Sequence, residues 1–175
     1  MNGKLHLFSI YTDFGAYRRI KWTVSAIEKL AGPRWQCSSE MWKVDSLVTN
    51  EPMKKMLAND GANADVLIAM VGSLEQQRPE LIDWLHSLAP LEPHRSGLLI
   101  GLLGDEENSS EELYWTAREL IRCAQKTNRK FIWHWMGHHA ADNPAWLAES
   151  VQMLLADKQQ FVRPIPESII LQEAV

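Results

Sequence analysis

One short apolar stretch, Ala64-Asp-Val-Leu-Ile-Ala-Met-Val-Gly-Ser73, constrains the fold of this chain more than any other feature. Its apolar residues follow one another without alternation, and glycines lie before it at Gly61 and within its end at Gly72. A run of this length that is apolar on both faces is typical of a strand buried between two layers. The stretch therefore predicts the central strand of a parallel sheet.

Four other segments have the pattern of strands, and helical periodicity fills the intervals between them. The predicted strands are 4–11, 35–44, 98–103 and 130–135, and the predicted helices are 16–30, 50–59, 78–88, 109–124 and 143–158. The 35–44 segment is the most polar, so we place it at an edge of the sheet. We expect Gly61 to end the second helix, and Ser109 with Glu112 to form a capping box for the fourth.

This alternation predicts a doubly wound α/β fold, a three-layer sandwich around a five-stranded parallel sheet. Right-handed crossovers favour the flavodoxin-like strand order 2-1-3-4-5. We expect a single α/β domain over residues 1–158, with 159–175 as a C-terminal extension that is packed on it or partly flexible. The chain of 175 residues is long enough to bury one sizeable core.

Net charge, the length of the apolar runs and the cysteine spacing argue against several classes of partner and site. The formal net charge is -4, which argues against nucleic acid as a partner. The longest apolar run, 98–103, is too short to span a bilayer, so we expect no membrane partner. The two cysteines, Cys37 and Cys123, match no metal or redox spacing, and we expect a cytoplasmic protein.

The candidate site follows from the fold, because ligands of open α/β sheets bind outside the carboxyl ends of the strands. Asp13 and Phe14 follow the first strand, Ser73 follows the third and Asp105 follows the fourth. We expect these four residues to bind a ligand. Asp13 and Asp105 could converge on a cation, although a turn residue and a loop acid are the simpler interpretation.

The familiar nucleotide loops are absent from the chain, which contains neither G-x-G-x-x-G nor G-x-x-x-x-G-K-S/T. Asp13 also places a carboxylate where a flavin or nucleotide phosphate would lie, and that arrangement is repulsive. We therefore expect no cofactor and identify no catalytic residue.

A histidine cluster after the fifth strand is the remaining chemical motif. His134, His138 and His139 lie near Asp142, and imidazoles beside a carboxylate can bind a divalent transition metal. The spacing matches no zinc signature, so an ordinary polar loop is the preferred interpretation and metal binding the alternative.

Asp13 after the first strand also resembles one member of the acidic pair of response-regulator receiver domains. The resemblance implies a phosphoacceptor aspartate after the third strand and a lysine after the fifth. Here the third strand ends Val71-Gly72-Ser73, and Lys130 begins the fifth strand rather than following it. The receiver-like phosphorylation residues are thus missing.

Over most of its length the chain is similar to a group of small bacterial α/β proteins without an established activity. The shared residues are Trp42-x-x-Asp45-x-Leu47, Ala64-Asp65-Val66, Leu81 to Leu85 and Leu99-Ile-Gly-Leu-Leu-Gly104. They are core and turn residues, so the similarity implies a fold and no chemistry.

These observations lead to two functional hypotheses. The preferred one is a non-enzymatic regulatory or signalling module that acts through a protein partner or by self-association. The alternative is a metal-assisted hydrolase or phosphotransfer enzyme that uses Asp13, Asp105 and the histidines. Eight tryptophans in 175 residues are more than one small core readily hides, so we expect a homodimer. The expected pairing surface carries four of them: Trp115, Trp133, Trp135 and Trp146.

Overall fold

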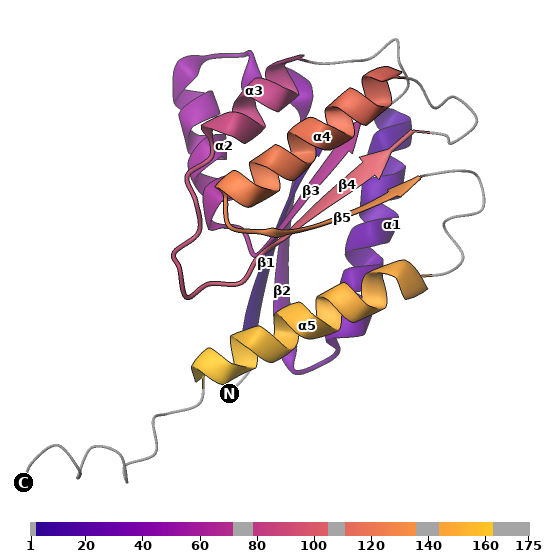
Figure 1. Cartoon of the computed structure of the whole chain (residues 1–175), viewed down its shortest axis with the longest axis vertical. Coiled ribbons are helices and arrows are strands. Elements are labelled where there is room, and N and C mark those ends of the chain that lie inside the picture. The colour runs from indigo at the N-terminus through magenta and orange to yellow at the C-terminus, as the bar shows by residue number, and fades with distance from the viewer. Residues whose placement is uncertain (1–2, 72–78, 105–110, 136–143, 163–175) are drawn as a thin grey trace, which may run out of the picture.

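The computed structural model describes residues 3–71, 79–104, 111–135 and 144–162. Its centre is a five-stranded parallel sheet in the order β2-β1-β3-β4-β5 (Figure 1). The strands are β1 (Gly3–Tyr11), β2 (Trp35–Lys43), β3 (Val66–Val71), β4 (Leu98–Leu103) and β5 (Lys130–Trp135). The predicted strand order is confirmed, and the polar β2 lies at an edge as expected.

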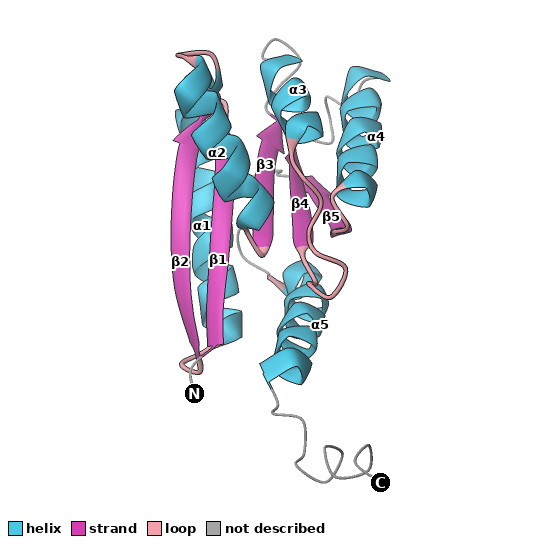
Figure 2. Ribbon diagram, turned by 90° about the vertical axis from the view of Figure 1, so that its left-hand side faces the viewer, coloured by secondary structure: helices cyan, strands magenta, loops and turns pink. Residues whose placement is uncertain are grey.

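Helices cover both faces of the sheet (Figures 1 and 2). One layer consists of α1 (Phe14–Ala31) and α5 (Ala145–Val162), which pack against each other. The other consists of α2 (Glu51–Asn63), α3 (Pro79–Ser87) and α4 (Glu111–Lys126), with a short 3-10 helix, η1 (Val44–Leu47). None of the helices in the described ranges has the length and hydropathy that a membrane-spanning segment needs.

The core divides into two halves because alternate residues of each strand face opposite layers. In β3, Val66 and Ile68 pack with α1 and α5, whereas Leu67 and Ala69 pack with α2, α3 and α4. The predicted core residues of the two central strands are all fully buried: Val66, Leu67, Ile68, Leu99, Ile100 and Leu102. Burial on both faces explains why these strands lack polar alternation.

Two helix ends differ from the sequence prediction. Gly61 lies inside α2 rather than ending it, and the indole of Trp84 packs against it. A Cβ at this position would be 2.8 Å from Cη2 of Trp84, so close packing explains the glycine. Helix α5 continues to Val162, past the expected end at Lys158, and the predicted Ser109 cap lies outside the described residues.

A charged cluster joins several elements at the amino end of the sheet. Asp65 is 4% exposed, and its Oδ2 accepts a hydrogen bond from the main-chain N of His6 at 2.9 Å. Its Oδ1 lies 3.2 Å from Nη2 of Arg95 and 2.5 Å from Nζ of Lys158. One carboxylate thus connects β1, the segment before β4, and α5.

Arg129 is buried beside this cluster. Its Nη2 donates to the carbonyls of Gly61, Ala62 and Ala64, each at 3.0 Å, so the guanidinium caps the end of α2. Burial lowers the pKa of Arg129 to about 10, and the group remains charged at neutral pH. A cation at a helix carboxyl end also interacts favourably with the helix dipole.

Candidate functional site

The carboxyl edge of the sheet has a very short first connection. β1 ends at Tyr11 and α1 begins at Phe14, so Thr12 and Asp13 alone join them. The strands that follow β1 in the chain, β2 and β3, lie on its two sides. This reversal makes the end of β1 the topological switch point, where open α/β sheets bind ligands.

Asp13 is the N-cap of α1. Its Oδ1 accepts a hydrogen bond from the main-chain N of Ala16 at 2.8 Å, and its main-chain O accepts one from the N of Tyr17 at 2.9 Å. Thr12 donates from Oγ1 to Asp13 Oδ2 at 3.4 Å. An aspartate in this position satisfies a first-turn amide and stabilises the helix. The structure thus gives Asp13 a local structural role at the switch point.

Three aromatic side chains surround this turn, and we call them the β1 aromatic cluster. Phe14 is 74% exposed and stacks on Tyr17, with ring centroids 6.1 Å apart and an interplanar angle of 23°. Tyr17 in turn meets Tyr11 edge-on at 5.4 Å. Phe14 was predicted from the sequence as a site residue, whereas Tyr11 and Tyr17 were not. The spacing of Phe14 and Tyr17, one helical turn apart, was the available signal.

The other predicted site residues are only partly described. Ser73, Asp105, His138, His139 and Asp142 lie outside the described residues, so the expected convergence of Asp13 with Asp105 stays a prediction. Within the described ranges, no group of three or more histidine, cysteine, aspartate or glutamate side chains is placed to hold a metal ion.

His134 is the one member of the histidine cluster in the described part of the chain. It lies in β5, is half-buried, and stacks on Trp146 with centroids 4.5 Å apart at 9°. Burial lowers the pKa of His134, so its imidazole is neutral at neutral pH. A neutral, stacked imidazole fits a packing role on this face of the sheet.

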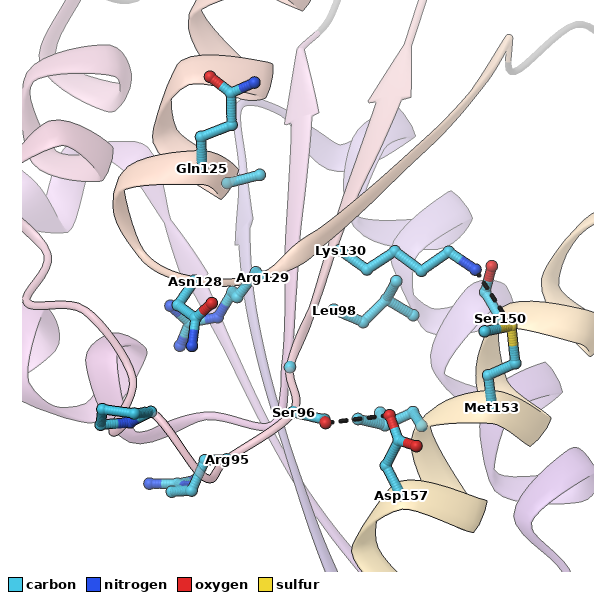
Figure 3. Close-up of a pocket in the computed structure, with 14 residues that line it drawn as sticks. Arg95, Ser96, Leu98, Gln125, Asn128, Arg129, Lys130, Ser150, Met153 and Asp157 are labelled. Atoms are coloured by element: carbon cyan, nitrogen blue, oxygen red, sulfur yellow. Dashed lines mark hydrogen bonds between the residues drawn. The ribbon is translucent and has the colours of Figure 1, made fainter.

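A cavity of about 380 Å³ lies at the opposite, amino end of the sheet (Figure 3). It is lined by residues from the end of α4, from the segments that lead into β4 and β5, and from α5. Ser96 donates from Oγ to Asp157 Oδ2 at 3.0 Å, and Lys130 points its Nζ at Sδ of Met153, 3.4 Å away (Figure 3). This cavity is at the wrong end of the strands for the ligands that open α/β sheets bind, so we place the site at the carboxyl edge.

No family model matches the chain, and no curated protein matches it. Among solved structures, an oxidoreductase from Corynebacterium diphtheriae superposes with a TM-score of 0.59 at 11% identity, covering 91% of this chain and 98% of that one. A short-chain flavodoxin associated with a bacterial microcompartment gives a TM-score of 0.50 at 12% identity, covering 92% and 99%.

A mutant flavo di-iron protein from Thermotoga maritima gives a TM-score of 0.55 at 11% identity. The match covers 90% of this chain and 36% of that protein, so the chain corresponds to about a third of its length. At such identities these similarities establish a flavodoxin-like fold and nothing further.

The comparisons correct the functional interpretation of the sequence. The prediction of a degenerate receiver-like regulatory module is wrong, because the neighbours are flavodoxin-like proteins named for flavins or redox chemistry. The alternative, a metal-assisted hydrolase or phosphotransfer enzyme, is overturned by the same finding. The missing phosphorylation residues were compatible with a flavodoxin-like protein as well as with a degenerate receiver.

A flavodoxin-like fold raises the question of whether the residues at the switch point fit flavin mononucleotide. An aromatic ring system fits the exposed face of Phe14. A phosphate at the start of α1 does not fit, because Asp13 already occupies the Ala16 amide and its carboxylate lies over Gly15. A Cβ on Gly15 would be 3.1 Å from Oδ1 of Asp13, so the space above this glycine is filled by a negative charge.

Proposed function

We propose that this protein binds a flavin-class ring at the carboxyl edge of its sheet and has a redox function. The observation that carries the proposal is Phe14, a large apolar side chain that is 74% exposed at the switch point. The flavodoxin-like fold supports the same location. An exposed aromatic ring at the switch point of an open α/β sheet is better explained by a ligand that stacks on it than by core packing.

The β1 aromatic cluster supplies a preorganised surface for such a ring. Tyr17 supports one face of Phe14, and Tyr11 supports Tyr17 from the end of β1. Because the cluster rests on a strand and a helix rather than a long loop, little conformational freedom is lost on binding. A bound flavin would supply electron-transfer chemistry, while these residues would orient the ring and shield it from water.

Flavin titration tests the proposal. Purified protein is titrated into riboflavin and into flavin mononucleotide, and quenching of flavin fluorescence gives each dissociation constant. Phe14→Ala removes one stacking partner and is expected to weaken binding by about 0.5–1.5 kcal/mol. That is about twofold to tenfold in affinity.

Met153→Ala is the matched control. Met153 is also exposed and apolar, but it lies near Lys130 at the amino end of the sheet, so its truncation is expected to leave flavin affinity unchanged. Failure of the wild-type protein to quench either flavin would overturn the proposal. Equal effects of the two substitutions would place the ring elsewhere on the protein.

We also propose that the protein forms a homodimer through the surface of α4 and β5. Among the side chains of these two elements that the structure describes, the exposed large apolar ones are Tyr114, Trp115, Ile121 and Trp133. Trp146, which was also expected at this interface, is partly buried and packs against the core and His134. Sedimentation equilibrium tests the dimer, with Trp115→Ala expected to weaken it; a mass near 20.0 kDa at every concentration would refute it.

A further inference from the structure

The turn between β1 and α1 holds a carboxylate at the start of a helix, and this charge limits which ligand groups can bind there. In flavodoxin-like sheets the start of the first helix lies beside the switch point, and the free amides of a helix N-terminus attract anionic groups such as phosphate. Here one of those amides, Ala16 N, is already bonded to Asp13 Oδ1 at 2.8 Å. The carboxylate therefore occupies the place of an anionic ligand group.

The length of the connection strengthens this point. With Thr12 and Asp13 alone between β1 and α1, the turn has no additional residues to wrap around a phosphate. Gly15 has no side chain that would keep a phosphate away from the main chain, but the Asp13 carboxylate lies over its Cα. An incoming phosphate would have to displace this carboxylate, which would lose its helix-capping bond, or lie beside it as a like charge.

Positive charge farther along α1 does not remove the local conflict. Arg18, Arg19 and Lys21 follow within the next two turns, so this segment of the chain has more cationic than anionic side chains. These side chains extend from later positions of the helix, whereas Asp13 lies directly on the first-turn amide. Long-range attraction to anions and exclusion of a phosphate from the helix start can therefore coexist.

We infer that the ligand of this site is a flavin without a phosphate group, of the riboflavin class, and that Asp13 selects against the phosphorylated form. This inference rests on the proposed function, because it specifies which flavin the same site accepts. Asp13 acts as a specificity-determining residue through charge. Its replacement by asparagine keeps an N-cap of nearly the same shape and removes the charge.

The experiment compares the affinities of riboflavin and flavin mononucleotide for the wild-type protein and for Asp13→Asn at low ionic strength. We expect the wild type to bind riboflavin at least about tenfold more tightly, from the repulsion between a carboxylate and a phosphate dianion at contact distance. Asp13→Asn is expected to tighten binding of flavin mononucleotide by more than it changes riboflavin affinity, so the ratio falls. Thermal unfolding of each variant verifies folding, and Asp13→Ser provides a second uncharged cap.

Glu28→Gln is the matched control, because it removes a carboxylate from the opposite end of α1. It is expected to leave the ratio of the two affinities unchanged. If the wild type binds flavin mononucleotide as tightly as riboflavin, or if Asp13→Asn does not change the ratio, this inference is wrong while the proposed function stands. If neither protein binds either flavin, the proposed function is wrong and this inference falls with it.

Discussion

Replacing Asp65 with asparagine tests the charged cluster at the amino end of the sheet. The carboxylate accepts a hydrogen bond from the main-chain N of His6 and forms ion pairs with Arg95 and Lys158. Asparagine has nearly the same shape and can still accept the His6 bond through its amide oxygen. The substitution therefore removes the negative charge and leaves three cations, Arg95, Arg129 and Lys158, close to one another.

The expected loss follows from the partners and their exposure. A hydrogen bond to a charged group contributes about 1.5–3 kcal/mol, and two such bonds are weakened here. Arg95 and Lys158 have side chains that are 31% and 22% exposed, so water recovers part of their solvation. We therefore expect Asp65→Asn to lower the free energy of unfolding by about 2–4 kcal/mol, a large part of the stability of a typical domain.

Urea denaturation followed by circular dichroism measures this loss. Asp60→Asn is the control, because Asp60 lies on the surface of α2 with a long 3.5 Å contact to Asn59 Nδ2. Its effect is expected to stay within about 0.5 kcal/mol. A loss below about 1 kcal/mol for Asp65→Asn would refute the reasoning, since it would mean that water replaces both cations at no cost.

Three further predictions concern stability. Leu99→Ala should cost about 2–5 kcal/mol in urea denaturation, because the side chain is fully buried; a loss below about 1 kcal/mol would contradict this. Gly61→Ala should lower the melting temperature, because the new Cβ would lie 2.8 Å from Trp84 Cη2, whereas a rise would indicate ordinary helix propensity. The hydrogen bond with His86 lowers the pKa of Glu119, so the ionised carboxylate stabilises the fold above pH 4.5, its ordinary pKa, and this stabilisation is lost as the pH falls through the lowered pKa. In an acid titration of unfolding free energy, Glu119→Gln should therefore lose less stability than the wild type. Identical curves would refute the role of Glu119.

The fold was largely predictable because the strand pattern is local. Residues 66–71 and 98–103 are apolar without alternation, and only a strand covered on both faces explains such a pattern at this length. The polar 35–43 segment forms the edge strand β2 for the complementary reason. Right-handed crossovers then leave few strand orders to choose from.

Contacts between residues far apart in the chain were not predictable. Gly61 has the local pattern of a helix end, and only the position of Trp84 on α3 explains why a glycine lies inside the helix. The same holds for Asp65, whose partner Arg95 lies 30 residues away. Such tertiary contacts override local propensity, and a single sequence contains no signal that identifies them.

At the candidate site, topology predicted the location and left the chemistry open. The position of Asp13 and Phe14 at the end of the first strand followed from the fold class. Only the side-chain geometry of the structure shows that Asp13 accepts a hydrogen bond from Ala16 N. The same holds for the support of Phe14 by Tyr11 and Tyr17. The functional interpretation failed because it depended on missing receiver residues, and an absence is compatible with several families of the same fold.

The two ends of the sheet have different physical roles. The amino end joins β1, the segment before β4, α2 and α5 through the buried charges of Asp65 and Arg129, so substitutions there should change stability. The carboxyl end has a two-residue turn and the exposed ring of Phe14, which makes few contacts with the core. Substitution of Phe14 should therefore change ligand affinity with little effect on stability. Asp65→Asn and Phe14→Ala should therefore separate effects on stability from effects on ligand affinity, as expected where function depends on a site carried by a common fold.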